Sequence, residues 1–197
     1  MKKTVVIGAT GTIGSAIVQL LEKNGYEVVP VSRKGKYAMD IDDPESIKNF
    51  FSQTSSVDNI ICAAGNASFG PLALLTDEQI DLGLKSKLMG QVNVVREGLK
   101  ILNPNGTIIL TGGMLAHQPG PATSAVAMVN AGLEGFVKAA ALDLTEGHRL
   151  LIVHPPFVKE TAQAMGIPAD NFLTAKEVVY PYLNGLQSQE SGVALYI

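Results

Sequence analysis

The sequence predicts an α/β fold in which a doubly wound, mostly parallel sheet lies between two layers of helices. Short β-branched runs alternate with longer segments of helical periodicity, and these runs are apolar on both faces. A glycine-rich turn follows the first run. Such alternation joins parallel strands by crossover helices that cover both faces of the sheet. The chain of 197 residues has no composition shift or linker, so one domain over 1–197 is expected.

The individual elements follow from these runs in chain order. Strands are predicted over residues 4–7, 27–32, 59–63, 107–111 and 150–154, with a short strand over 37–41 and a closing strand over 193–197. Helices are predicted over residues 13–24, 44–53, 77–102 with breaks, 126–145 and 176–186. Gly25 is a typical helix stop. Residues 155–168 contain several prolines and are expected to form a surface loop.

Composition and charge exclude several classes of protein. The net charge is −3 and no basic run occurs, which argues against binding to a phosphate backbone. No apolar stretch of the roughly 20 residues that a membrane span needs is expected in this chain. Cys62, the single cysteine, lies in an apolar run and is expected to be buried without a disulfide. A protein of the reducing cytoplasm fits these features best.

The turn over residues 8–14 has the sequence Gly-Ala-Thr-Gly-Thr-Ile-Gly and lies between a predicted strand and a predicted helix. Glycines let the backbone approach a pyrophosphate, and the helix N-terminus offers free N–H groups to its charge. The turn is not a Walker A loop, because no Gly-Lys-Ser/Thr follows. It predicts a Rossmann-type dinucleotide site, although a tight turn without a ligand stays open. The predicted binding residues here are Gly8, Thr10, Gly11, Thr12, Ile13 and Gly14.

The end of the second predicted strand indicates which dinucleotide would bind. An NAD site usually has an acidic residue there, whereas this chain has Ser32 and Arg33, followed by Lys34. A hydroxyl and a guanidinium suit a 2′-phosphate, and one charge-assisted hydrogen bond favours NADP(H) over NAD(H) by roughly 1.5 to 3 kcal/mol. The alternative is that the two cations are ordinary solvated loop charges.

Several further segments show that the chain resembles the short-chain dehydrogenase/reductase family over nearly its whole length. Gly132, Gly135, Lys138 and Asp143 match the spacing of that family's long helix. The other matching segments are Asp40-Ile41-Asp42, Cys62-Ala63-Ala64-Gly65 and His154-Pro155-Pro156-Phe157-Val158. The resemblance implies that Asp40, Ile41, Ala63, Ala64 and Gly65 lie near the adenine half of the cofactor, and Pro155 and Val158 near the nicotinamide.

The same resemblance shows that the family's catalytic residues are missing. Val126 stands where the family has its Tyr, and Asn130 where it has its Lys. Gly112 or Gly113 takes the Ser position, and Lys87 lies near the Asn position. No Tyr-x-x-x-Lys occurs anywhere in the chain. A positioned acid contributes roughly 10² to 10⁴ in rate, so the missing donor separates cofactor binding from catalysis.

Four residues are candidates for a substitute proton donor: Thr111, His117, Ser124 and Lys87. Each also has a structural explanation, as a strand end, a loop residue, a helix N-cap and a solvated helix charge respectively. His117, His148 and His154 show no paired ligand spacing with carboxylates, so no metal site is expected.

Two classes of function therefore stay open from the sequence. One is an NADP(H)-dependent oxidoreductase that acts on a small carbonyl or alcohol with a non-standard proton donor. The other is a non-catalytic NADP(H)-binding sensor or regulatory protein. A sugar-nucleotide epimerase is less favoured, because such relatives carry the missing Tyr/Lys pair. Residues 157–175, with Met165 and Phe172 as apolar cover, are the one segment available as a substrate loop.

Oligomer formation is also expected from the resemblance. Ala127, Ala131, Gly135 and Ala139 place small residues along the long predicted helix. They suit a close helix contact in a homodimer or homotetramer, although packing within one chain explains them equally well.

Overall fold

The computed structural model describes every residue from 1 to 197 and contains one six-stranded sheet in the order β2-β1-β3-β4-β5-β6. Every neighbouring pair of strands is parallel, so the predicted doubly wound parallel sheet is confirmed. The strands are β1 Lys3–Ile7, β2 Glu27–Val31, β3 Val57–Cys62, β4 Leu102–Thr111, β5 Arg149–Val153 and β6 Ala194–Leu195.

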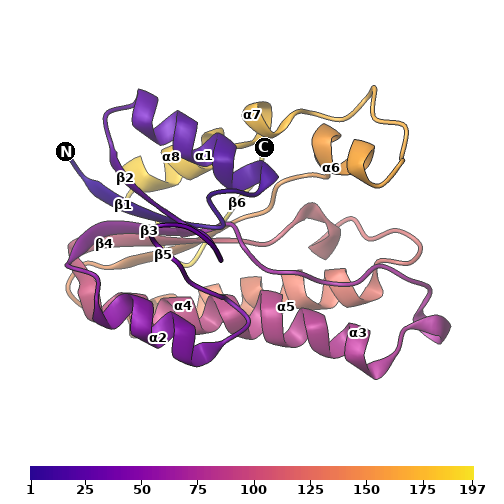
Figure 1. Ribbon diagram of the computed structural model, residues 1–197, viewed down its shortest axis with the longest axis horizontal. Helices are drawn as coiled ribbons and strands as arrows, with labels where there is room; N and C mark the ends of the chain where they lie inside the picture. The colour runs from indigo at the N-terminus through magenta and orange to yellow at the C-terminus, as the bar shows by residue number, and fades with distance from the viewer.

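Helices cover both faces of this sheet (Figure 1). One face carries α1 Thr12–Lys23, α6 Lys159–Ala164, α7 Ala175–Val178 and α8 Tyr180–Gln187. The other carries α2 Pro44–Ser52, α3 Asp77–Leu82, α4 Gly90–Gly98 and α5 Ser124–Ala140. Short 3₁₀ turns occur at η1 Leu72–Leu74, η3 Leu99–Ile101, η4 Met114–Ala116 and η5 Ala141–Asp143, and η2 Gly83–Met89 is a π-helix.

The sheet separates two apolar cores, and alternate residues of each strand enter opposite cores. Ile108 and Leu110 of β4 point into the core beneath α2, α4 and α5, whereas Ile109 between them points into the core beneath α1, α7 and α8. This is why the strands are apolar on both faces. Cys62 is fully buried in the first core, and burial raises the pKa of its thiol to about 12, so it packs as an inert hydrophobe.

The strand predicted over residues 37–41 is wrong, since only an isolated bridge between Ser32 and Ala38 forms there. The reason is local competition for the backbone. The N–H of Asp40 donates to Ser46 Oγ at 2.9 Å, and the Asp40 carboxylate accepts from the N–H of Asp42 at 3.1 Å. These bonds draw the segment toward the start of α2 and away from a ladder. β2 therefore lies at the sheet edge, where Pro30 has no N–H to donate.

The breaks predicted within residues 77–102 are confirmed: the segment is divided into α3, the π-helix η2, α4 and η3, because backbone bonding widens over Gly83–Met89. Two other predictions need correction. The predicted loop over 155–168 contains α6. Ser124 does not cap the long helix: it is the first residue of α5, the N-cap is Thr123, and no side chain makes a capping bond.

The long helix α5 and η5 together form the one segment, Ser124–Asp143, that is long and apolar enough to cross a membrane, with a mean hydropathy of 1.3. This corrects the expectation that no such stretch exists. The segment lies along the sheet, and its apolar side, which includes Val129 and Leu133, is buried in the fold. Ala131 and Gly135 lie on its exposed side, so a contact between the long helices of two copies stays a prediction.

Candidate active site and cofactor cleft

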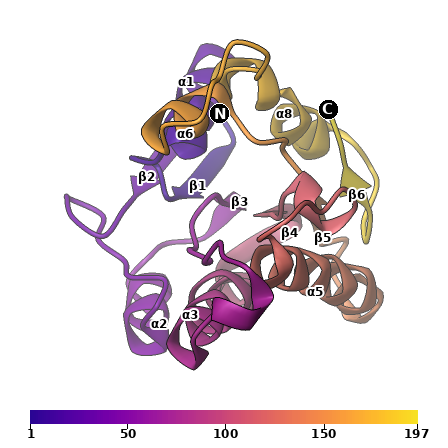
Figure 2. The same ribbon diagram turned by 90° about the vertical axis from the view of Figure 1, so that its right-hand side faces the viewer.

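Two adjoining cavities lie at the carboxyl end of the sheet, the end that Figure 2 shows. The smaller has a volume of about 240 Å³ and the larger about 670 Å³, and the two share the wall Ala63, Ala64, Gly65 and Asn66. Ligands bind in this crevice in open parallel sheets. The larger volume is within the usual range for a small-molecule site.

The glycine turn forms the floor of the smaller cavity. Gly8 has φ +83°, and a Cβ there would lie 2.7 Å from the carbonyl oxygen of Ala63. Gly14 lies beneath the turn and lines neither cavity: its Cβ would come within 2.0 Å of the Gly8 oxygen. Gly11 caps α1 without a side-chain bond, so the first-turn N–H groups are open to an anion. This cradle and this helix end fit a dinucleotide pyrophosphate.

Other predicted cofactor residues lie in the same cavities. The smaller cavity is lined by Gly8, Thr10, Gly11, Ser32, Arg33, Asp40 and Ile41, together with the shared wall. Arg33 is exposed and makes no ion pair or side-chain hydrogen bond within the chain, whereas the Ser32 hydroxyl donates to the Lys34 carbonyl at 2.5 Å. Thr12, Ile13, Pro155 and Val158 line the larger cavity.

Lys87 is the one ionisable residue that lines the larger cavity. Its Nζ donates at 3.0 Å to the carbonyl of Gly112, which lies in the loop that follows β4. Burial lowers the pKa of Lys87 to about 8. Gly65 makes this position possible, because a Cβ on Gly65 would lie 2.8 Å from the Cα of Lys87. An ammonium with a pKa close to neutral is suited to proton transfer.

The other three donor candidates are placed less favourably. The Thr111 hydroxyl lies 2.9 Å from the Tyr182 hydroxyl in the core beneath α8, although Thr111 also lines the larger cavity. Ser124 is exposed and lines neither cavity. His117 also lies outside both cavities. Of the four, the structure brings only Lys87 and Thr111 to the crevice.

Two buried polar side chains, one on η2 and one on α4, hold the segment that follows β3 and the end of β4, and sequence reasoning missed them. The buried amide of Gln91 accepts from the N–H of Thr111 and donates to its carbonyl, each at 2.9 Å. The buried Ser86 hydroxyl accepts from the N–H of Asn66 at 2.9 Å. Their spacing from Lys87 is the available signal, because Ser86 precedes it and Gln91 lies one helical turn beyond it.

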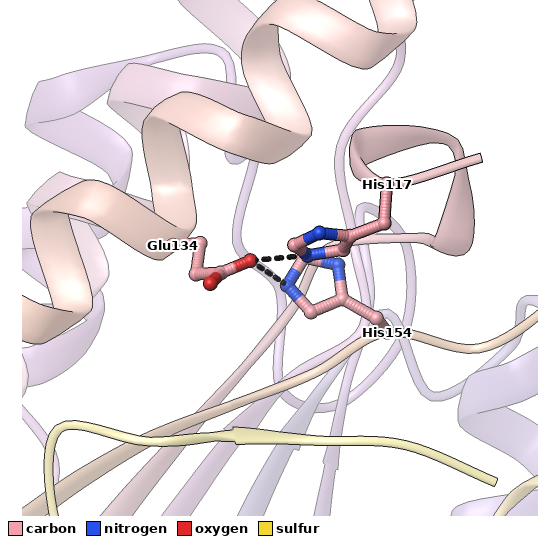
Figure 3. Close-up of side chains that lie close together, drawn as sticks. All are labelled: His117, Glu134 and His154. Atoms are coloured by element: carbon pink, nitrogen blue, oxygen red, sulfur yellow. Dashed lines mark hydrogen bonds and ion pairs between the residues drawn. The ribbon is translucent and has the colours of Figure 1, made fainter. Parts of the chain in front are cut away.

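The expectation of no metal site rested on sequence spacing and stays untested, but the fold brings together three side chains that are distant in the sequence. His117 follows η4, Glu134 lies on α5 and His154 follows β5, yet Figure 3 shows both imidazoles directed at one carboxylate. Their ligand atoms all lie within 4.8 Å of one another. Residues distant in the chain meet here because the carboxyl ends of neighbouring parallel strands share one edge.

Val126 and Asn130 line the larger cavity on the α5 side, in the positions where the resemblance puts Tyr and Lys. Val126 is 7% exposed and has no proton to donate. Asn130 is 1% exposed, and its amide nitrogen donates to the Gly113 carbonyl at 3.4 Å. Neither side chain can act as a general acid. Lys87 is the one ionisable side chain in this cavity that can donate a proton.

Comparisons with known proteins agree with this geometry. The model of the family described as Enoyl-(Acyl carrier protein) reductase matches residues 8–195. The 3-oxoacyl-[acyl-carrier-protein] reductase FabG of Rickettsia conorii is 28% identical over 176 residues, which cover 80% of this chain and 73% of that protein. Carbonyl reductase family member 4 of Xenopus laevis is 24% identical over 216 residues, covering 95% and 92%.

Solved structures match along the whole chain. The protein lin1944 from Listeria innocua superposes with a TM-score of 0.94 at 32% identity, covering 100% of both chains. A small-chain dehydrogenase in complex with NADPH has a TM-score of 0.89 at 26% identity, covering 100% of this chain and 96% of that one. With a family match over nearly its full length and a glycine-lined crevice at the strand ends, this chain belongs to the short-chain dehydrogenase/reductase family.

Proposed function

We propose that this chain is an NADP(H)-dependent oxidoreductase that acts on a small carbonyl or alcohol, with Lys87 as its proton donor. Its family membership makes it an oxidoreductase of the short-chain dehydrogenase/reductase type. The observation that carries the finer proposal is the placement of one cation, with its pKa lowered to about 8, in the larger cavity. A similar chain solved with NADPH supports the choice of cofactor.

The open first turn of α1 would bind the pyrophosphate of the cofactor, and Arg33 would bind its 2′-phosphate. Asp40 and Ile41 would border the adenine half, and Pro155 and Val158 the nicotinamide half. The nicotinamide supplies or takes the hydride when it is bound. Everything else that the reaction needs must come from side chains of the larger cavity.

Lys87 would perform the acid–base part of that reaction. Its ammonium holds a proton at Nζ, and the Gly112 carbonyl fixes the direction of that group. A developing alkoxide in the cavity takes this proton, and in the reverse direction the neutral amine removes the proton from an alcohol. Phe157 and Val158 add apolar side chains to the border of the same space.

Replacement of Arg33 by alanine is expected to weaken NADPH binding by about 10- to 100-fold and leave NADH binding unchanged. The expectation follows from the loss of one charge-assisted hydrogen bond to a 2′-phosphate. Fluorescence titration with both dinucleotides measures it. Lys36→Ala is the matched control, because Lys36 is a cation of the same exposed segment that lies outside the cofactor cavities. Equal losses for NADPH and NADH in the Arg33 variant would contradict the assignment.

The pH dependence of turnover tests the proposed donor. Carbonyl reduction needs protonated Lys87, so kcat/KM is expected to be constant below pH 8 and to fall by about tenfold per pH unit above it. Alcohol oxidation needs the neutral amine and is expected to rise toward pH 8 and then level off. Initial rates in both directions over pH 6 to 10 measure this. A profile without a transition near pH 8 removes Lys87 from the mechanism.

A non-catalytic NADP(H) sensor is the second candidate, and Val126 and Asn130 favour it. These side chains border the larger cavity where the family has its acid and its lysine. Oxidation of NADPH measured with a panel of small aldehydes and ketones separates the two functions. Turnover supports the oxidoreductase, whereas tight NADPH binding without turnover supports the sensor. Absence of dinucleotide binding overturns both.

A further inference from the structure

A cluster of two imidazoles and one carboxylate lies outside the proposed cofactor site. Glu134 Oε2 is 2.6 Å from His117 Nε2 and 3.2 Å from His154 Nε2 (Figure 3). His154 is fully buried and Glu134 is 6% exposed, whereas the His117 side chain is 40% exposed. The cluster therefore has a rigid buried base and one ligand at the surface, through which an ion can enter.

His154 Nε2 is a buried polar atom without a hydrogen-bond partner, and it is directed into this cluster. The other ring nitrogen, Nδ1, lies 3.0 Å from the Gly113 carbonyl and 3.0 Å from the Gly113 N–H. In the tautomer in which Nδ1 donates to the carbonyl, Nε2 has no proton, and its lone pair is available to a cation placed between it and the carboxylate. A metal-binding histidine typically donates its other N–H to a backbone carbonyl in this way.

The contacts around the carboxylate suit a cation. Glu134 accepts from the Lys138 ammonium at Oε1 and lies between two imidazoles at Oε2. Metal binding requires neutral imidazoles and an ionised carboxylate, so a bound cation would displace the proton that His117 and Glu134 share.

Both oxygens of the Glu134 carboxylate have partners, and only one of them faces the imidazoles. The Lys138 ammonium contacts Oε1 at 2.5 Å and its side chain is 60% exposed, whereas Oε2 faces both imidazoles, so a cation there would replace the hydrogen bond between Oε2 and His117 Nε2. The Tyr196 hydroxyl lies 3.1 Å from His117 Nε2, and its ring stacks on His154. In a tetrahedral zinc site the ligand atoms are about 3.3 Å apart, given bonds of about 2.0 to 2.1 Å. The 3.2 Å separation between His154 and Glu134 already matches, whereas His117, at 2.6 Å from Oε2, has to move away from the carboxylate.

We propose that His117, Glu134 and His154 form a binding site for a zinc-type divalent transition ion, with the fourth position open to water. Two histidine nitrogens and one carboxylate oxygen are a donor set typical of zinc. The ion would join the loop after β4, helix α5 and the end of β5, and through Nδ1 of His154 it would hold the Gly113 peptide at the rim of the larger cavity. None of the three ligands lines the larger cavity, so the ion would stabilise the cavity wall and would take no part in hydride transfer.

Calorimetric titration with zinc chloride tests the site, on the full chain without a polyhistidine tag and after treatment with EDTA. The wild-type chain is expected to bind one equivalent. His117→Ala is expected to weaken binding by about 100-fold, because one of three protein ligands is lost. His148→Gln is the matched control: it removes a histidine that also lies near a glutamate, at 3.9 Å, but outside the cluster.

Binding of Co²⁺ provides a second, spectroscopic measurement on the same variants. Tetrahedral nitrogen and oxygen ligation gives visible absorption bands, which are expected in the wild type and in His148→Gln and absent in His117→Ala. His117 is at the surface, so its removal is not expected to affect folding. Fewer than one equivalent of bound Zn²⁺, or equal affinity in the wild type and His117→Ala, overturns the proposal.

Discussion

Replacement of Lys87 by methionine is expected to lower kcat for carbonyl reduction by about 10² to 10⁴ while NADPH binding is kept. Methionine has a similar length and fills the same space, but it has no proton to donate. Lys87 is the one ionisable group in the larger cavity, so no neighbouring side chain takes over the role. Initial rates at saturating NADPH measure kcat, and fluorescence titration measures binding of the dinucleotide.

The free energy of unfolding of Lys87→Met should rise while its kcat falls. This result would distinguish loss of the proton donor from damage to the fold. The pKa of Lys87 is 10.5 in the unfolded chain and about 8 in the folded chain. This difference means that the buried ammonium lowers the free energy of unfolding by roughly 3 kcal/mol at pH 7. Loss of the hydrogen bond to the Gly112 carbonyl offsets about 1 to 2 kcal/mol of this. The free energy of unfolding of Lys87→Met should therefore be about 1 to 2 kcal/mol higher than that of the wild type.

The sign of the pH dependence follows from the same shift. Between pH 8 and 10.5 the unfolded wild-type chain binds more protons at Lys87 than the folded chain, so wild-type stability rises with pH there. The methionine variant should lack this rise. Lys85→Met is the matched control, because Lys85 is exposed on the same π-helix and pairs with Asp81. A Lys87→Met protein that is less stable than the wild type and inactive would point to a structural role.

Replacement of Gly14 by alanine is expected to cost about 3 kcal/mol or more of folding free energy and to abolish tight NADPH binding. A Cβ at this position would lie 2.0 Å from the Gly8 oxygen and 2.7 Å from the Gly8 carbonyl carbon. Both contacts are with backbone, which has no rotamer to change. The turn must therefore open, and the cradle beneath the pyrophosphate opens with it.

Urea unfolding and fluorescence titration measure the two effects of Gly14→Ala. Gly135→Ala is a suitable control, because Gly135 is also in a helix and a Cβ there meets nothing within 4 Å. That variant should gain about 0.5 to 1 kcal/mol from helix propensity. If Gly14→Ala matches the wild type in stability and in NADPH affinity, the glycine turn does not work as described.

The sequence predicted the sheet and the floor of the crevice because local patterns determine both. Short apolar runs that alternate with helical segments define the strands. Between β1 and α1 the backbone of neighbouring segments approaches so closely that only glycine fits. Every predicted cofactor residue except Gly14 lines one of the two cavities. Gly14 serves the same turn from beneath.

The position of Lys87 and the cluster of two histidines and one glutamate depend on contacts between distant segments, which no local sequence pattern indicates. Nothing near Lys87 in the chain indicates that its ammonium reaches Gly112, because that contact joins η2 to the loop after β4. The cluster of His117, Glu134 and His154 likewise needs three elements to meet at one sheet edge. The failed strand over 37–41 has the opposite cause, since polar side chains beside it compete for its backbone.

The π-helix η2 makes the position of Lys87 sensitive to chain length. In a regular α-helix each residue turns the side-chain direction by about 100°, so a one-residue deletion within Gly83–Met89 would restore ordinary helical bonding and rotate Lys87 away from Gly112. The length of this segment, and not its residues alone, therefore determines which side chain faces the larger cavity.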